Sequence, residues 1–336
     1  MNFRKFFAIS LSVFLIAVPI IAQDDDASAF PVTIENCGVE ITYDAPPQQA
    51  ITMNQGATEI MLALGLEDSM VGTAYLDDFI LPELEEVYDS VPVLSDTYPS
   101  QEIIFGADPD FIYGSYNSAF GDEAAGPREQ LLDLNIGSYV SPMACADRSL
   151  RPEVVSMEDV YGEILNIGII FGVQDRAEVL IEELQSELDE ITEILAEVEE
   201  PVSVFWYDSG TDDVYTGACC GAPNIIMELL GVENIFGDVE GSWATVSWEE
   251  VVARDADFIV LVNADWDTSE EKIDTLTSNP AYADMTAVED ENWVVIDFSY
   301  TTPNIRNVEA VRIIAEALYP DLFEDVEAEA TEEADD

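Results

Sequence analysis

The chain has 336 residues, of which 71 are acidic and 10 are basic, and its formal net charge is −61. Such a charge repels phosphate groups, which excludes nucleic acid and anionic membrane surfaces as partners. The sequence contains no histidine, so a Ser-His-Asp triad is excluded and the usual ligand of protein-bound zinc is missing.

Residues 1–22 are predicted to be a secretory signal peptide. Arg4 and Lys5 precede an apolar run over residues 6–21 that is too short for a membrane span. Without these two residues, 8 basic residues remain against 71 acidic ones, a formal charge of −63. No cysteine stands at the expected cleavage point, so the common bacterial lipid anchor has no attachment residue there. We expect an exported protein in the periplasm or at the extracellular face of the cytoplasmic membrane.

The segment 30–150 alternates short apolar stretches with helical patterns. A leading hairpin is expected from 32–34 and 39–43, and main strands are expected at 50–53, 70–74, 111–114 and 138–140. Helical segments at 57–64 and 128–134 lie between them. Continuous apolar strands separated by helices are typical of a parallel, doubly wound sheet. We therefore predict a first αβ lobe over 30–150.

Linking helices are predicted over 156–200, and the stretch from Asp175 to Glu200 reads as one long helix. Asp175 can cap its start, and Pro201 follows its end. At about 1.5 Å per residue, some 25 residues span roughly 37 Å, enough to connect two bodies. An ordinary surface helix is the alternative. The apolar residues recur at steps of three and four: Ala177, Leu180, Ile181, Leu184, Leu188, Ile191, Leu195 and Val198.

A second αβ lobe is predicted over 201–320. Its expected strands are 202–207, 258–263 and 293–298, its expected helices are 224–230 and 307–318, and a glycine-containing loop spans 217–223. With 48% hydrophobic residues, the chain can fill the cores of two lobes despite its charge. Residues 321–336 are nearly all Glu, Asp and Ala, which predicts a solvated, disordered tail.

The two halves of the chain repeat each other. Ser100-Gln-Glu102 returns as Ser247-Trp-Glu249, and in each half an Asp-x-Asp-Phe-Ile stretch follows, at a constant offset of 147 positions. A looser match relates 60–67 to 226–233. Segments that recur in the same order on both sides of a long helix indicate two similar lobes.

The four cysteines are Cys37, Cys145, Cys219 and Cys220. Export permits disulfides, and four cysteines allow three pairings. We favour a bond between Cys37 and Cys145, which both lie in the first lobe. The adjacent Cys219 and Cys220 are open to three interpretations: a vicinal disulfide, a soft-metal site, or free thiols, which is the ordinary one.

Aromatic residues gather near the ends of predicted strands, where open sheets bind ligands. Loops of two lobes that face each other there would form an aromatic cleft suited to a large, flat, partly polar molecule. The alternative for any one of these residues is a place in the core or on the surface. The residues are Tyr98, Tyr113, Tyr116, Tyr207, Tyr215, Trp243, Trp266 and Tyr300.

Together these features resemble the substrate-binding proteins of ABC importers for cobalamin and ferric siderophores. The resemblance covers about 30–320 and rests on the signal peptide, the long helix, Asn36-Cys-Gly38, 58–65, Ser100-Gln-Glu102, Asp108-Pro-Asp110, Glu233-Asn-Ile-Phe236, Trp243 and Val246-Ser-Trp-Glu249. A subgroup assigned to import of a deazaflavin-cofactor precursor is similar at Tyr207-Asp-Ser-Gly210, Gly221-Ala-Pro223, 264–268 and Arg306-Asn-Val308. That match adds Arg306 to the candidate ligand-binding residues.

The resemblance implies two αβ lobes joined by a single long helix, and a non-enzymatic monomer without a cofactor. Its partners would be a small ligand, an ABC permease and the permease's ATPase. In the family, one glutamate on each lobe pairs with permease arginines, and the matching positions are Glu102 and Glu249, which the internal repeat also pairs. The family's cleft tryptophan matches Trp243, and its first-lobe aromatics match Tyr98 and 113–116. Metal-binding relatives use histidines, so no metal is expected.

Two other functions compete with import. The first is an enzyme on the same scaffold, such as a redox protein that uses Cys219 and Cys220. The second is a cell-surface sensor or adhesin that has lost its permease. Adjacent permease and ATPase genes would favour import, whereas an isolated gene would favour the alternatives.

Overall fold

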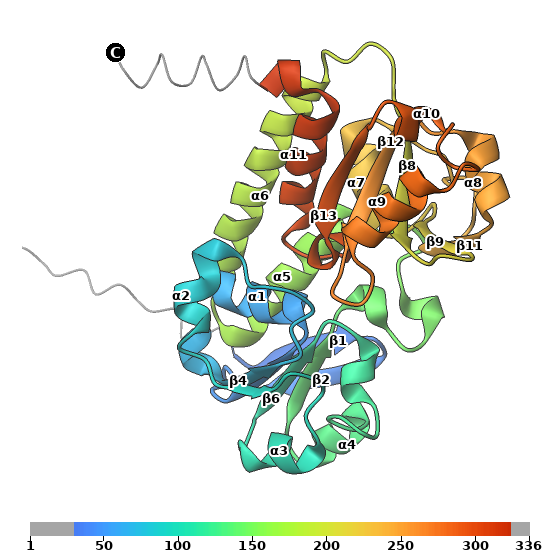
Figure 1. Ribbon diagram of the computed structural model, residues 1–336. Coiled ribbons are helices and arrows are strands. Elements are labelled where there is room, and N and C mark those ends of the chain that lie inside the picture. Colours follow the sequence, from blue (N-terminus) through green and yellow to red (C-terminus); the bar gives the residue numbers. More distant parts are fainter. Residues whose placement is uncertain (1–29, 324–336) are drawn as a thin grey trace, which may run out of the picture.

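The computed structural model describes residues 30–323 and consists of two αβ lobes connected along one side by long helices (Figure 1). The predicted signal peptide and residues 324–336 of the predicted tail lie outside the described residues. Within 30–323, no helix is both long enough and apolar enough to cross a membrane.

The first lobe contains a parallel sheet of five strands in the order β5-β4-β3-β6-β7. Its central strand, β3, is completely buried. The predicted leading hairpin, β1 and β2, pairs in antiparallel register beside this sheet. The strands are β1 (Val32–Asn36), β2 (Val39–Tyr43), β3 (Ala50–Met53), β4 (Met70–Ala74), β5 (Val93–Ser95), β6 (Phe111–Gly114) and β7 (Gly137–Val140). The lobe's helices are α1 (Gln55–Ala63), α2 (Glu85–Tyr88), α3 (Gln101–Gly106) and α4 (Arg128–Asp133).

The sheet of the second lobe follows the order β11-β9-β8-β12-β13, and β10 also pairs with β8. Strands β8, β12 and β13 are parallel, whereas β9 and β11 form an antiparallel edge that the sequence analysis missed. The strands are β8 (Ser203–Ser209), β9 (Val214–Gly217), β10 (Glu233–Asn234), β11 (Trp243–Val246), β12 (Phe258–Asn263) and β13 (Trp293–Asp297). The helices are α7 (Ala222–Leu230), α8 (Trp248–Arg254), α9 (Ser269–Ser278), α10 (Thr286–Glu289) and α11 (Asn307–Leu318).

The internal repeat has a structural counterpart in each lobe. Helix α3 leads into β6, and α8 leads into β12, as the offset of 147 positions predicts. In the first lobe, Asp110 accepts a hydrogen bond from the backbone N–H of Gln49 (2.9 Å). In the second, Asp257 accepts one from the backbone N–H of Ser203 (3.0 Å). Each aspartate thus fixes the start of the neighbouring central strand, which explains why this part of the repeat is the clearest.

Two helices form the connection between the lobes, α5 (Met157–Phe171) and α6 (Gln174–Leu195). Gly172 adopts a left-handed conformation (φ 67°) that ends α5 and lets the chain turn directly into α6. The predicted long helix is therefore present, but it ends at Leu195 rather than Glu200. Its start is not capped by Asp175, because the residue at the cap position is Val173.

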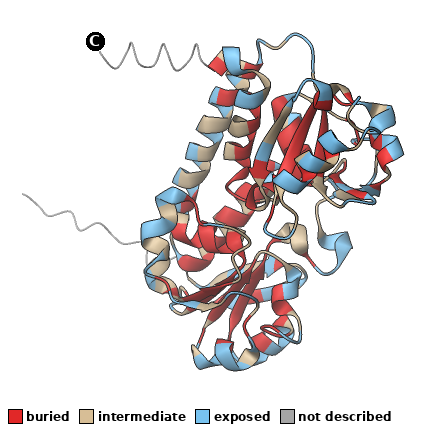
Figure 2. Ribbon diagram, viewed as in Figure 1, coloured by how far each residue is buried: buried red, intermediate tan, exposed pale blue. Residues whose placement is uncertain are grey.

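The apolar stripe of α6 belongs to a core that both lobes share. This large core includes Phe111 of the first sheet, Val204 and Val260 of the second, and buried residues of α5, α6 and α11. Figure 2 shows the buried positions continuing from the strands of both sheets into these helices. Each sheet has one smaller core on its opposite face. The lobes are thus joined by packing as well as by the chain.

The predicted disordered tail begins too early. Leu322 packs against the large core, and Phe323 is buried in it with 8% of its surface exposed. Their apolar side chains lose contact with water by joining this core, which accounts for their place in the folded part of the chain.

Candidate ligand cleft

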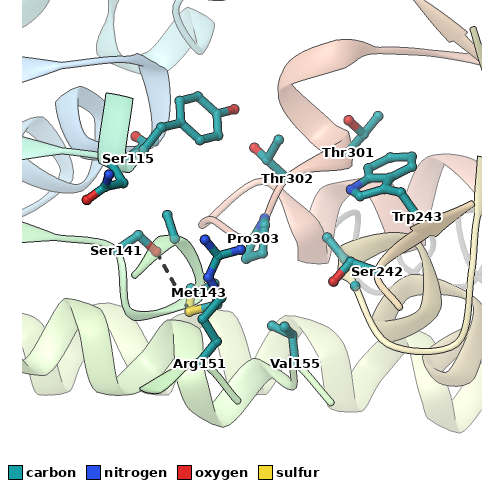
Figure 3. Close-up of a pocket in the computed structure, with 16 residues that line it drawn as sticks. Ser115, Ser141, Met143, Arg151, Val155, Ser242, Trp243, Thr301, Thr302 and Pro303 are labelled. Carbon is teal, nitrogen blue, oxygen red and sulfur yellow. Dashed lines mark hydrogen bonds between the residues drawn. The ribbon is translucent and has the colours of Figure 1, made fainter. Parts of the chain in front are cut away.

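A cavity of about 300 Å³ lies between the lobes (Figure 3). No acidic residue lines it, although the chain contains 71 of them. Its lining comes from both lobes: Gly56, Ser115, Tyr116, Asn117, Ser141, Met143, Ala144, Arg151, Val155, Gly221, Ala222, Ser242, Trp243, Thr301, Thr302 and Pro303.

The carboxyl ends of parallel strands supply the first-lobe wall. Ser115 directly follows β6 and Ser141 directly follows β7, which places both at the same edge of the sheet. The opposite wall contains Trp243, the first residue of β11. Its ring stacks on Tyr215 of β9, with centroids 5.3 Å apart and planes 11° apart. The antiparallel edge of the second sheet therefore holds the cleft tryptophan in a fixed orientation.

Of the predicted ligand-binding residues, Tyr116 and Trp243 line the cleft. The side chain of Tyr116 interacts with Thr302 of the other lobe, and burial raises its pKa. Tyr98 lies in a neighbouring hollow beside Tyr75. Its hydroxyl lies within hydrogen-bond distance of the Asn54 side chain (2.8 Å).

Three predicted tyrosines belong to the core and do not line the cleft. Tyr113 is fully buried, and its hydroxyl donates to Glu163 (2.6 Å). Tyr207 of β8 is buried against Phe205 and Trp248, and its hydroxyl donates to the carbonyl of Gly210 (2.8 Å). Tyr300 is also buried. Because side chains alternate between the two faces of a strand, the positions of Tyr113 in β6 and Tyr207 in β8 did not guarantee access to the cleft.

The predictions for Arg306 and Trp266 also need correction. The side chain of Arg306 is fully buried and forms a two-point ion pair with Glu59 on α1, at 2.8 and 2.5 Å. This pair joins the second lobe to the first, so Arg306 has a structural partner instead of a place in the cleft. Trp266 is 63% exposed and packs edge-on against Phe298, outside the cavity.

Arg151 is the charged residue of the cleft, and the sequence analysis missed it. It follows the turn that contains Cys145, and its Nε donates to the Cys145 carbonyl (2.6 Å). The rest of the guanidinium points into the cavity (Figure 3). Only eight basic residues follow the predicted signal peptide, and this scarcity marks each of them as worth attention without distinguishing Arg151 from the other seven.

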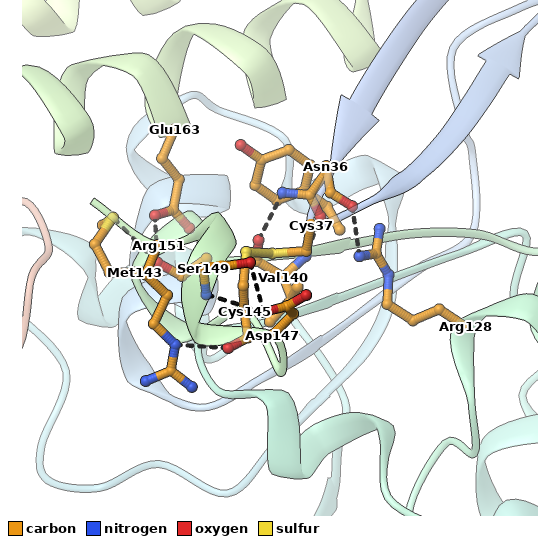
Figure 4. Close-up of a disulfide and its surroundings, with 12 residues drawn as sticks. Asn36, Cys37, Arg128, Val140, Met143, Cys145, Asp147, Ser149, Arg151 and Glu163 are labelled. Carbon is orange, nitrogen blue, oxygen red and sulfur yellow. Dashed lines mark hydrogen bonds between the residues drawn. A yellow bond between two sulfur atoms is a disulfide. The ribbon is translucent and has the colours of Figure 1, made fainter. Parts of the chain in front are cut away.

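A disulfide supports the turn that carries Arg151. Cys37, in the β1–β2 turn, is bonded to Cys145, with Cα atoms 5.3 Å apart (Figure 4). The neighbouring Asn36 side chain donates to the carbonyl of Val140 (2.9 Å) and accepts from its N–H (3.0 Å). The hairpin is thus fastened to the end of β7.

The second cysteine pair also forms a disulfide, between Cys219 and Cys220, so the free-thiol interpretation is wrong. This pair immediately precedes the cleft residues Gly221 and Ala222. The carbonyl of Cys220 accepts a hydrogen bond from the N–H of Val155 (3.1 Å). Within residues 30–323, no cluster of three or more Cys, Asp or Glu side chains is placed to hold a metal ion.

A buried carboxyl group lies beneath the cleft. Glu163 of α5 accepts hydrogen bonds from Tyr113 (2.6 Å) and from the cleft residue Ser141 (2.7 Å). Burial raises the pKa of Glu163 from 4.5 to about 7, against the opposing effect of these two hydrogen bonds. The folded protein thus holds the Glu163 proton more tightly than the unfolded chain does. Its contribution to stability is complete below pH 4.5 and is lost as the pH rises through about 7.

Glu163→Gln is expected to raise the free energy of unfolding at pH 8 by about 1–3 kcal/mol, because the neutral amide avoids burying a charge. At pH 5 the variant and the wild type should differ little. Urea unfolding at both pH values measures the effect. The control is Glu190→Gln on the exposed face of α6, which should be nearly neutral at both. Equal effects of Glu163→Gln at pH 5 and pH 8 would contradict this prediction.

The two glutamates paired by the repeat occupy equivalent places. Glu102 is the second residue of α3, and Glu249 is the second residue of α8. Both are exposed. In each lobe a serine at the N-cap position, Ser100 or Ser247, stands two residues before the glutamate, so the two glutamates have the same local structure.

Comparison with known proteins gives consistent matches. A family model described as periplasmic binding protein matches residues 51–300. An uncharacterized ABC transporter substrate-binding lipoprotein of Bacillus subtilis is 26% identical over 300 residues, which are 88% of each chain. A cobalamin-binding protein of Halobacterium salinarum is 26% identical over 73% of this chain and 62% of that protein. The crystal structure of a periplasmic binding protein from Veillonella parvula matches with a TM-score of 0.76 and 29% identity, over 86% of this chain and 97% of that one.

Proposed function

Because the chain belongs to the periplasmic binding protein family, we propose that it captures a small molecule between its lobes outside the cytoplasm and delivers it to an ABC permease. The cleft lined from both lobes is the observation that carries this proposal. The Bacillus subtilis relative is named as an ABC transporter substrate-binding lipoprotein, which supports a role in transport.

The cleft favours a ligand with a flat, partly polar ring system. The indole of Trp243 lines the cavity and stacks on the ring of Tyr215, so an aromatic surface is available to a flat ligand. Hydroxyl groups of Ser115, Ser141 and Thr302 surround the space and supply hydrogen bonds. The volume of about 300 Å³ is at the lower end for ligand pockets. A deazaflavin-like ring fits this description, and a cobalamin- or siderophore-like ligand would place one end in the cavity.

Delivery requires contact with a permease, and we assign that contact to Glu102 and Glu249. One exposed glutamate at the start of an equivalent helix in each lobe forms a two-point surface for paired permease subunits. Arginines of the permease would form charge-assisted hydrogen bonds with these carboxylates. Since the whole chain is acidic, the position of these two groups matters more than their charge.

Glu102→Ala and Glu249→Ala are each expected to reduce ligand-dependent stimulation of the permease ATPase by at least roughly ten-fold, as for truncation of an interfacial charge pair. The measurement uses the permease and ATPase encoded in the same genome, reconstituted in liposomes. Glu190→Ala and Glu197→Ala remove the same charge from exposed sites near the end of α6 and should have little effect. If all four variants stimulate alike, the docking role is wrong.

A further inference from the structure

Basic groups are scarce in this chain, and most of them are already engaged. Of the eight basic residues in 30–323, Arg148 is exposed and Arg151 lines the cleft. The remaining six bind backbone carbonyls or carboxylates: Arg128, Arg176, Arg254, Lys272, Arg306 and Arg312. The Nε of Arg151 is held by the Cys145 carbonyl. Its two terminal nitrogens contact no acceptor within 30–323 and are free for a ligand.

The N-terminus of α7 adds a second positive element to the same cavity. Gly221 and Ala222, at the start of this nine-residue helix, line the cavity, and no side chain caps them. Their N–H groups have no acceptor among the described residues. A Cβ at Gly221 would lie 2.7 Å from the Cβ of Ser242, so glycine keeps the backbone close here. The helix dipole gives this end a partial positive charge.

The distribution of acidic residues follows the same pattern. Among the described α-helices, α1 and α7 are the two without an acidic residue in their first turn. Both begin at the cleft, where Gly56 and Ala222 line the cavity. Asp77 accepts a hydrogen bond from the N–H of Gln55 (3.4 Å) at the start of α1, and Glu163 accepts one from Ser141 (2.7 Å), but neither carboxyl group lines the cavity. No carboxylate therefore lines the cavity or stands in the first turn of α7, where it would compete with an anionic ligand.

We propose that the ligand presents an anionic group, a carboxylate or a phosphate, to Arg151 and the N-terminus of α7. This inference rests on the proposed function and specifies its ligand class. The two terminal nitrogens of Arg151 form a planar pair that suits the oxygens of either group. The net charge of the chain repels anions at a distance, but salt screens that repulsion beyond about 10 Å. Short-range contacts inside the cleft can therefore dominate.

Matched pairs of probes test this inference by fluorescence titration of the full mature chain. FMN and riboflavin differ by a phosphate, and hemin and hemin dimethyl ester differ by free carboxylates. In the pair that binds, the anionic member should bind roughly ten- to hundred-fold more tightly, as expected for hydrogen bonds to a charged group. Arg151→Gln should abolish the preference for the anionic member, whereas Arg151→Lys, which keeps the charge, should retain part of it. A preference for FMN over riboflavin identifies a phosphate as the anionic group, and a preference for hemin over its dimethyl ester identifies a carboxylate.

Two further variants separate the possible outcomes. Arg148→Gln removes the same charge three residues away from an exposed site and should leave the preference unchanged. Ala222→Asp supplies the acid that α7 lacks and should weaken the anionic probe more than its neutral partner. Equal affinity for both members of a pair would overturn the inference while leaving the proposed function intact. The same holds if Arg148→Gln and Arg151→Gln reduce the preference for the anionic member equally. Binding of no probe from either pair would count against a ring-ligand binding protein and therefore against both proposals.

Discussion

Replacement of Arg306 by methionine is expected to lower the free energy of unfolding by about 3–5 kcal/mol, because Glu59 would be left charged and unpaired in the interior. Both side chains of this ion pair are completely buried. Arg306 also donates to the carbonyl of Phe79 (2.6 Å), so the substitution removes a further contact between the lobes. Urea unfolding at pH 7, followed by circular dichroism, measures the loss.

Arg312→Met provides a matched control within α11. Arg312 pairs with Glu187 at 3.0 Å, but both side chains are about one-third exposed, at 33% and 38%. An ion pair that water reaches contributes little, so this variant should lose about 1 kcal/mol or less. A double variant, Glu59→Leu with Arg306→Met, should recover part of the loss because no lone charge remains buried. If Arg306→Met and Arg312→Met lower the free energy of unfolding equally, burial of the ion pair between Arg306 and Glu59 does not determine its contribution to stability.

Removal of the Cys37–Cys145 disulfide, by replacing both cysteines with serine, is expected to cost about 2–5 kcal/mol of stability. The bond joins residues 108 positions apart. In the chain-entropy model, the closure of a loop of about 100 residues contributes up to about 4.7 kcal/mol, by restricting the unfolded chain. Thermal and urea unfolding of the double variant, compared with the oxidised wild type, provide the measurement.

The vicinal pair is the natural comparison. Cys219 and Cys220 are adjacent, so their disulfide closes almost no loop and restricts the unfolded chain far less. Replacing both with serine should therefore change the unfolding free energy much less than replacing Cys37 and Cys145. A similar loss from both double variants would mean that local packing, and not loop closure, sets the effect of the long-range disulfide.

Sequence reasoning succeeded where the signal was local or repeated. The apolar stripe of α6 could be predicted because its residues share one helical face. The similarity of the two lobes could be predicted because Asp110 and Asp257 recur in the sequence, and each accepts a hydrogen bond at the start of a central strand. It failed where a role depends on distant partners. Whether Tyr113 faces the cleft or the core depends on Glu163, 50 residues away, and Arg306 is held by Glu59, 247 residues away.

The antiparallel edge of the second lobe was missed for a related reason. Strands β9 and β11 are four residues each, too short to leave a clear alternation pattern, and they are stabilised by pairing with each other and with β8. As a result, Tyr215 and Trp243 were expected in loops, although Trp243 does reach the cleft. Arg151 stood out only after the structure showed that the other basic residues around the cleft were engaged or distant.

The core shared by the lobes is completed by the last part of the described chain. The inner face of the first sheet packs against α5 and α6, and these helices pack in turn against α11 and Phe323 near the end of the described chain. A chain that is synthesised from its N-terminus is therefore expected to keep apolar surface uncovered until α11 has been made. Neither half contains all of this core, so a chain cut short before α11 is expected to expose apolar surface to proteases and chaperones.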